Sequence, residues 1–395
     1  MSEATAEVGA RVREARKRRG LTQRELAAAA GLSLSLVTKL EQGAQPGVRL
    51  ETVHKLAVPL QVTTTALMSE PDADDRRHDD SRVWDALRAA LETSSSTEPD
   101  DVPTIAGMRD ALTIAGRALL DSQYYELSVT LPVLVRDSDV LVNTSTGRAV
   151  RLARQVRSDV RQLAAFVMGQ AWQFDVATSG IQLALNDADD PVTVMSALDW
   201  QCWILLRQGR LAESGRLAER FADEYRPELT KATSDELVSW GRLTLRISSA
   251  AVRDNRPDDA REALRLARMA AGGLHRDTVA HFRAFGPVTV AMIHAENAMI
   301  QDRPDVTLLV GAQIVGRDFP VPRNFLRHRL DVAHAHAATR QYGKAVAVLQ
   351  EVRASAPEWL AQQRYAKDIF GTVIERRRTL TDEMRDLARF MHLAL

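Results

Sequence analysis

Cysteine is almost absent from this chain, since Cys202 is the only one among 395 residues. A single cysteine excludes an internal disulfide and every multi-cysteine metal site, and it fits a reducing compartment. Because Cys202 lies between Trp200 and Trp203, we expect it to be a small residue of the hydrophobic core.

Aromatic residues make up only 5% of the chain, and it contains 20 glycines and 14 prolines. Alanine, leucine and valine dominate the apolar 45%, which is the composition of a helix-forming sequence. We therefore predict an all-α protein with almost no strand. A chain of 395 residues exceeds the size of one hydrophobic core, so it needs several domains or an extended repeat array.

Long apolar runs are missing as well. No run approaches the ~20 residues of a membrane-spanning helix, and residues 1–10 lack the basic and apolar stretches of a signal peptide. These absences predict a cytoplasmic protein without membrane contact.

Motifs of catalysis and of cofactor binding are not found either. The sequence has no phosphate-binding glycine loop, no nucleophile elbow and no HExxH motif, so we expect neither an enzyme nor a cofactor. His334 and His336 follow His328 closely, but positions two apart on a helix face different directions and no cysteine or carboxylate cluster joins them. We therefore predict no metal site.

The charges that are present are unevenly distributed. Arginine supplies nearly all of the positive charge, which favours a GC-rich bacterial genome such as an actinobacterial one, and the net charge is zero. Residues 1–68 contain ten basic and six acidic residues, whereas residues 69–101 contain four basic and eleven acidic ones. The amino-terminal segment is therefore the candidate for contact with an acidic partner.

Residues 1–68 predict five short helices. The first carries basic residues on its exposed face and ends at Gly20. Thr22 and Glu25 form a capping box that starts the second helix, and Gly31 ends it. The remaining three helices are predicted at 33–42, 50–60 and 63–68.

Two short helices joined by a glycine-containing turn form a unit that places the second helix in the major groove of DNA. The stretch GLTQRELAAAAGLSLSLVTKLEQG resembles the Cro/cI-type (xenobiotic-response-element, XRE) helix-turn-helix of phage repressors and bacterial regulators. The resemblance implies a transcriptional regulator that binds double-stranded DNA. The alternative is a small five-helix bundle that uses the same turn chemistry.

The same resemblance implies particular DNA contacts. Gln23 matches a phosphate anchor at the amino end of a helix, and Arg49 matches a loop residue that approaches the minor groove or the backbone. The base-reading region of the third helix corresponds to Ser33, Leu34, Ser35, Thr38 and Lys39. Because Leu34 offers only contact with a thymine methyl, specificity per half-site should be modest, so we expect a homodimer on a palindromic operator.

Residues 69–103 are predicted to be an acidic linker that contains one short amphipathic helix, in VWDALRAALE. Its charge either keeps the linker solvated or competes with DNA phosphates for the basic helix.

Residues 104–395 predict a succession of amphipathic helices with a drifting repeat. Small residues recur at intervals of 37, 46, 47 and 38, at Ala177, Ser214, Ala260, Thr307 and Ala345. This spacing resembles a degenerate tetratricopeptide array, which implies an α-solenoid with a concave groove and a role in sensing and dimerisation.

The first helices of the pairs carry the candidate effector contacts: Trp203, Trp240, Arg246, His294 and Asn297. Such a mixed surface suits a small molecule or a peptide, although each tryptophan taken alone is better explained as a core residue than as a ligand contact. Resemblance to quorum-sensing regulators of this architecture implies that Asn297 holds a peptide backbone. An effector would then change how the two heads meet DNA. The alternative function is a constitutive DNA-tethered scaffold for a protein partner.

Overall fold

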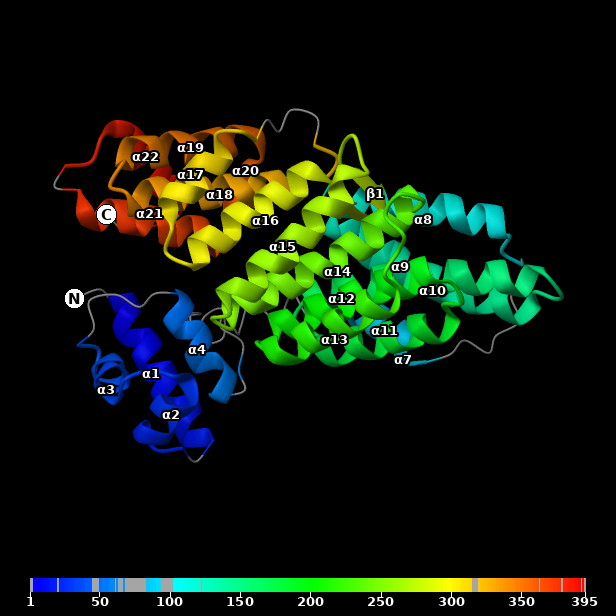
Figure 1. Ribbon diagram of the computed structural model, residues 1–395, viewed down its shortest axis with the longest axis horizontal. Coiled ribbons are helices and arrows are strands. Elements are labelled where there is room, and N and C mark those ends of the chain that lie inside the picture. Colours follow the sequence, from blue (N-terminus) through cyan, green and yellow to red (C-terminus); the bar gives the residue numbers. More distant parts are fainter. Residues whose placement is uncertain are drawn as a thin grey trace. The chain divides into compact units, whose positions relative to one another are not determined.

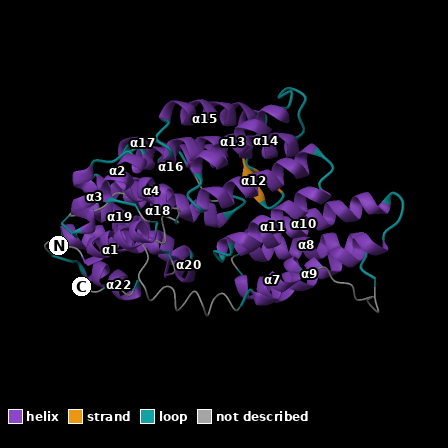
Figure 2. Ribbon diagram, turned by 90° about the horizontal axis from the view of Figure 1, so that it is seen from below, coloured by secondary structure: helices purple, strands orange, loops and turns teal. Residues whose placement is uncertain are grey.

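The computed structural model describes residues 3–19, 21–44, 50–60, 62, 67, 83–93, 102–121, 123–314, 319–361, 363–377, 379–391 and 393. These residues are almost entirely helical, and their one sheet pairs β1 (Thr278–Ala280) with β2 (Arg283–Phe285) (Figure 2). The predicted all-α fold class is confirmed. Within the described residues, no helix is long and apolar enough to cross a membrane.

The amino-terminal helices are α1 (Glu3–Arg18), α2 (Gln23–Ala30), α3 (Leu34–Glu41) and α4 (Leu50–Leu60) (Figure 1). Their apolar faces meet in one small core that includes Val12, Leu26, Val37, Leu40 and Leu56. The helix predicted at 63–68 lies outside the described residues, apart from Leu67, and so does Gly20.

Local chemistry sets the boundaries of α2 and α3 as predicted. The Thr22 hydroxyl accepts from the Glu25 backbone at 3.2 Å, and the Glu25 carboxylate accepts from the Thr22 backbone at 2.7 Å, which completes the capping box. Gly31 then adopts a left-handed conformation with φ of 63°. This conformation is unfavourable for residues that have a Cβ atom. The Ser33 hydroxyl caps α3 by accepting from the Leu36 backbone at 3.2 Å.

The short helix expected within the linker is present as α7 (Asp85–Glu92). Its buried residues Leu87, Ala90 and Leu91 belong to the hydrophobic core that also contains residues of the following helices, and α7 packs against α9 (Tyr124–Thr144). The acidic segment 70–82 lies outside the described residues.

Most of the remaining described residues form helical pairs. Their bounds are α8 (Ile105–Leu120) with α9, α10 (Ala149–Gln170) with α11 (Phe174–Asp187), α12 (Pro191–Arg207) with α13 (Leu211–Glu224), α14 (Ser234–Arg253) with α15 (Pro257–Gly272), α16 (Pro287–Ile300) with α17 (Pro304–Gly311), and α18 (Pro322–Ala338) with α19 (Tyr342–Ser355). Three more helices follow, α20 (Pro357–Ala361), α21 (Arg364–Arg376) and α22 (Asp382–Phe390).

The turn inside five of these pairs has the same backbone conformation. One residue in each turn has a positive φ, and these residues are Trp172, Gly209, Asn255, Asp302 and Arg340. Five positions after each of them stand the predicted small residues, and Ala177, Ser214, Ala260, Thr307 and Ala345 are at most 1% exposed. The predicted repeat is therefore confirmed, because a small side chain at this position lets the second helix approach the first.

Two of these small residues also satisfy a carbonyl of the first helix in their pair. The Ser214 hydroxyl donates to the carbonyl of Cys202 at 2.9 Å, and the Thr307 hydroxyl donates to the carbonyl of Ala295 at 2.9 Å. Cys202 is buried, as expected of a small core residue.

The chain divides into two compact units, which are described separately. The first unit contains residues 1–266 and 280–282, and the second contains residues 267–279 and 283–395. Most of the buried apolar residues from Leu330 to Met391 form one core of the second unit.

The tip of the β-hairpin contributes two residues to the first unit. His281 and Phe282 have positive φ values of 44° and 63°, although neither is a glycine. The Phe282 ring lies so close to Gly116 that a Cβ there would be 2.5 Å from it. His281 Nδ1 lies 2.8 Å from a carboxylate oxygen of Asp159. These contacts hold a turn that local sequence preferences disfavour.

Candidate nucleic-acid interface and effector residues

The exposed face of α3 and its N-cap present the predicted base-reading side chains. Ser33, Ser35 and Lys39 are exposed, Leu34 is 40% exposed, and Thr38 is half-buried. Val37 and Leu40 face the opposite way and are fully buried in the head core. An eight-residue helix with one buried and one exposed polar face is suited to insertion in the major groove.

Gln23, the predicted phosphate anchor, makes two hydrogen bonds inside the head. Its amide nitrogen donates to the Glu41 carboxylate at 2.8 Å, and its amide oxygen accepts from the Thr38 hydroxyl at 3.2 Å. Thr38 is therefore held in place by α2, which reduces its rotamer freedom. A DNA phosphate that uses Gln23 has to share or replace these bonds.

Glu41 and Arg16 form the ion pair that connects α3 to α1. Arg16 Nε and Nη2 donate to the two Glu41 oxygens at 2.6 and 2.8 Å, and Arg16 Nη1 donates to the Leu21 carbonyl at 2.8 Å. Burial opposes ionisation of Glu41, but the hydrogen bonds from Arg16 and Gln23 lower its pKa below the ordinary value. The pair ties α3, which carries most of the predicted DNA contacts, to α1.

Sequence reasoning missed this ion pair. It placed the basic residues of the first helix on an exposed face, whereas Arg16 contacts Glu41 and Arg11 Nε donates to the Leu67 carbonyl at 2.8 Å. The available signal was Glu41 itself, since it falls beside Val37 and Leu40 on the apolar face of α3. A charged residue at such a position needs a partner. Arg49 lies outside the described residues.

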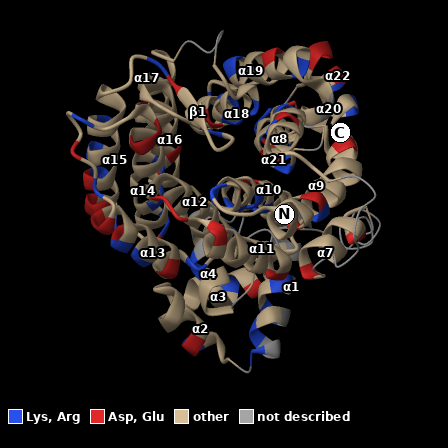
Figure 3. Ribbon diagram, turned by 90° about the vertical axis from the view of Figure 1, so that its right-hand side faces the viewer, with Lys and Arg blue, Asp and Glu red and all other residues tan. Residues whose placement is uncertain are grey.

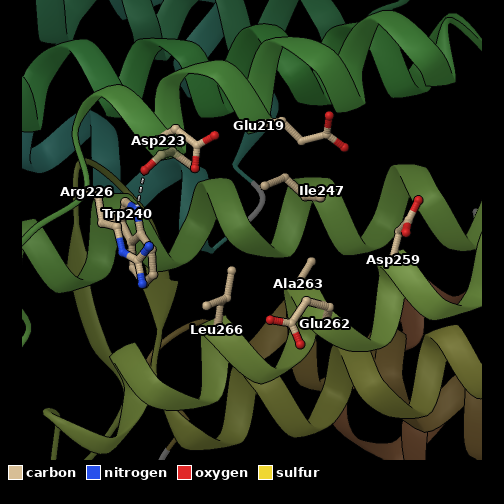
Figure 4. A pocket seen from close by; sticks show the side chains of 10 residues that line it. Glu219, Asp223, Arg226, Trp240, Ile247, Asp259, Glu262, Ala263 and Leu266 are labelled. Atoms are coloured by element: carbon tan, nitrogen blue, oxygen red, sulfur yellow. Dashed lines mark hydrogen bonds between the residues drawn. The ribbon is translucent and has the colours of Figure 1, made fainter.

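Trp240, a predicted effector contact, lines a pocket of about 240 Å³ in the first unit (Figure 4). Its ring is only 2% exposed, and its indole nitrogen donates to the Ala222 carbonyl at 2.8 Å. Acidic side chains of α13 and α15 line the pocket (Figure 4), and they are Glu219, Asp223, Asp259 and Glu262. Figure 3 shows acidic positions in red along α15. Trp240 thus contributes to the apolar floor of an acidic pocket.

Arg246, another predicted effector contact, belongs to a buried ion cluster. Its Nε donates to Asp199 at 2.5 Å, and Arg242 Nε donates to the other Asp199 oxygen at 3.4 Å. All three residues are less than 9% exposed. A ligand reaches Arg246 only if this cluster opens.

Trp203 is half-buried on α12 and packs against Phe166, with ring centres 5.1 Å apart. A Cβ at Gly169 would lie 2.8 Å from the Trp203 ring, so the glycine on α10 makes room for the indole. Part of the ring remains accessible to solvent.

His294 and Asn297 both belong to α16, in the second unit. Asn297 is 4% exposed, whereas His294 is half-buried. Burial and the nearby positive charge of Arg268 lower the pKa of His294, which favours the neutral form of the imidazole. The first unit holds the other three predicted effector residues, Trp203, Trp240 and Arg246.

His328 is the most deeply buried of the histidines considered as metal ligands. It is 3% exposed, and neither ring nitrogen has a hydrogen-bond partner among the described residues. Burial, aided by Arg329, lowers its pKa to about 4. No group of three metal-ligating side chains occurs in the part of the chain that the structure describes.

We expect His328 to make the second unit sensitive to acid. Its pKa in the folded state is about 4, below the ordinary value of 6.5. Above pH 6.5 the imidazole is neutral in both the folded and the unfolded chain, so it causes no loss of stability there. Between these two values the unfolded chain binds the proton more strongly, and stability falls by on the order of 3 kcal/mol as the pH decreases. Between pH 7 and pH 5 the wild-type protein should show the first part of this loss of stability. His328→Leu should abolish the contribution of His328 to it. An unchanged pH profile of unfolding would contradict the assignment, and His275→Leu is a control on a histidine without this burial.

Comparisons with known proteins agree with the head structure. A helix-turn-helix domain family matches residues 7–70. No curated protein matches the chain. Among solved structures, the crystal structure of Bacillus thuringiensis PlcR in complex with the peptide PapR7 and DNA is 11% identical, covers 78% of this chain and 95% of its own, and has a TM-score of 0.38. The match at residues 7–70 and the repeat geometry together identify the chain as a helix-turn-helix DNA-binding transcriptional regulator with tetratricopeptide-like repeats.

Proposed function

We propose that this regulator binds a palindromic operator as a homodimer and responds to a small-molecule or peptide effector held by its repeats. The DNA part of this proposal rests on the exposed face of α3, where Ser35 and Lys39 are exposed and Thr38 is held by Gln23. One eight-residue helix makes few base contacts, which favours two-fold binding to paired half-sites. Sedimentation that showed only a monomer with and without operator DNA would remove the dimer.

Lys39→Ala is expected to weaken operator binding by roughly 1 to 3 kcal/mol and to relax the preference at one base pair, if Lys39 contacts a guanine. Arg49→Ala should instead weaken binding to all sequences and flatten its salt dependence, because a phosphate contact carries no sequence information. Fluorescence anisotropy with a set of mutated operators at several salt concentrations measures both effects.

Lys231→Ala is the matched control, because Lys231 is an exposed lysine outside residues 7–70. It should leave both the affinity and the salt slope unchanged. A chain lacking residues 1–68 that still bound the operator normally would contradict the assignment of the DNA interface.

We propose that Asn297 makes the central polar contact with the effector and that His294 contributes from the same helix. Asn297→Ala should abolish the effect of active cell extracts on operator binding while ligand-free DNA affinity stays near its original value. A tenfold response requires the effector to discriminate between two head arrangements by about 1.4 kcal/mol, which one or two hydrogen bonds supply.

Because Asn297 is buried, thermal unfolding has to accompany this experiment, and Gln301→Ala is the control at the exposed end of the same helix. A full response in a folded Asn297→Ala protein would make the residue structural. If no extract alters operator binding, the constitutive scaffold becomes the better account.

A further inference from the structure

Arg207 is the last residue of α12 and lies between two tryptophans of the first unit. Its guanidinium carbon is 4.5 Å from the ring centre of Trp172 and 5.2 Å from that of Trp203. Both distances are in the range of cation–π attraction. The two indoles therefore form the walls of a site with the guanidinium between them.

No carboxylate neutralises this guanidinium within the described part of the chain. Its Nε is buried without a hydrogen-bond partner, whereas the buried Arg161 donates to both Asp139 and Asp187 at 2.8 and 2.7 Å. Burial lowers the pKa of Arg207 to about 10, and Tyr124 is the group that partly opposes this shift. Arg207 thus carries a positive charge in a position where the described residues provide no carboxylate partner.

The two walls are held in place at a structural cost. Trp172 has a φ of 64° at the turn position that Gly209 and Asn255 occupy in the next two pairs. A tryptophan is disfavoured in this conformation, so the surrounding contacts have to maintain it. On the other side, the Trp203 ring depends on the missing side chain of Gly169.

The cluster is in contact with solvent. Trp172, Trp203 and Arg207 are all half-buried, so each retains some surface exposed to solvent. The planar guanidinium offers parallel N–H donors, which match the two oxygens of a carboxylate. The flanking indoles exclude part of the water and strengthen such a pair.

We propose that Arg207, Trp172 and Trp203 form a carboxylate-binding subsite of the first unit. This inference rests on the proposed function, in that it names the chemical class of the effector: a carboxylic acid with a flat or apolar group beside the carboxylate. The acid is either a small aromatic molecule or the free carboxyl terminus of a short peptide.

Titration of the purified full-length protein with benzoate and with N-acetyl-leucyl-phenylalanine tests the two sources. Benzamide and the carboxyl-terminal amide of the same peptide are the neutral counterparts. We expect the carboxylates to quench tryptophan fluorescence and raise the Tm, and the neutral compounds to bind at least about tenfold more weakly. The carboxylate that binds more tightly identifies the source.

Arg207→Gln should weaken carboxylate binding by at least about tenfold, because it removes the charge that the anion recognises. Trp172→Asn should weaken it as well, and it introduces the residue type found at Asn255, which tolerates the backbone conformation. Arg210→Gln is the control, since Arg210 is exposed and already paired with Glu213. It should leave carboxylate binding unchanged.

Absence of carboxylate-dependent changes up to about 10 mM, equal binding of the neutral compounds, or undiminished binding by Arg207→Gln would overturn the subsite. Operator affinity measured in the same samples separates this outcome from failure of the proposed function. Carboxylate binding without any change in operator affinity leaves the subsite intact and removes its role in sensing. If active cell extracts still change the operator affinity of Arg207→Gln, the sensing function stands, but Arg207 is not the residue that contacts the effector.

Discussion

Replacing Glu41 with alanine is expected to destabilise the helix-turn-helix head by about 3 to 5 kcal/mol and to abolish operator binding. The Glu41 side chain is 1% exposed and that of Arg16 only 12%, so the substitution leaves a poorly solvated guanidinium without its carboxylate. Gln23 loses the same partner, and its hold on Thr38 weakens. Hydrogen exchange across α2 and α3, measured in the full chain, reports the local loss of stability.

Two variants distinguish charge burial from simple loss of contacts. The double variant Arg16→Met, Glu41→Leu replaces the ion pair by apolar groups and should recover most of the stability, since no unpaired charge remains. Glu25→Ala removes an exposed carboxylate of the α2 capping box and should destabilise the head much less. Normal protection of α2 and α3 in Glu41→Ala would show that the ion pair contributes little.

The same ion pair predicts the acid response of the head. The pKa of Glu41 lies below its ordinary value of 4.5 in the folded state, so its contribution to stability is complete above that value. The contribution is lost as the pH falls through the lower folded pKa, because the unfolded chain then binds the proton more strongly. The wild-type head should therefore lose stability below about pH 4.5, and the double variant should lose less.

The second large effect is expected for Asp199→Ala in the first unit. Asp199 is 1% exposed and is the carboxylate that Arg242 and Arg246 share, so its removal leaves two buried guanidiniums without it. We expect a loss of about 3 to 5 kcal/mol, measured as a decrease in the urea midpoint of the full chain. Asp189→Ala, which breaks an exposed pair with Arg151, should cost less than about 1 kcal/mol.

This comparison also decides the role of Arg246, which sequence reasoning placed among the effector contacts. If Asp199→Ala is unstable, Arg246 serves mainly to neutralise a buried carboxylate. If the variant is as stable as the wild-type protein but no longer responds to effector, Arg246 is free to act as a ligand contact, and the interpretation of the cluster is wrong.

Local features of the sequence were sufficient to predict α2, α3 and α4 in the head and the repeat of the body. The capping box at Thr22 and the glycine at position 31 act within one helical turn, so their chemistry does not depend on distant residues. The intervals between Ala177, Ser214 and Ala260 are likewise visible in the chain, because each pair of helices needs a small residue at the same place.

The hairpin at 278–285 could not be predicted in this way. Its strands are only three residues long, too short for a clear alternation of apolar and polar residues. His281 and Phe282 occupy turn positions that favour glycine or asparagine. Contacts with Gly116 and Asp159, more than 100 positions earlier in the chain, maintain this conformation instead.

By itself the sequence determined which faces of the helices are apolar, where α2, α3 and α4 begin and end, and which segment forms the helix-turn-helix domain. Tertiary structure alone decided which charge meets which. Glu41 pairs with a residue 25 positions away, Asp199 with one 47 positions away, and Arg207 with two indoles and no carboxylate in the described chain. Helical periodicity specifies the face on which a residue lies, but the identity of its partner depends on how helices distant in sequence pack together.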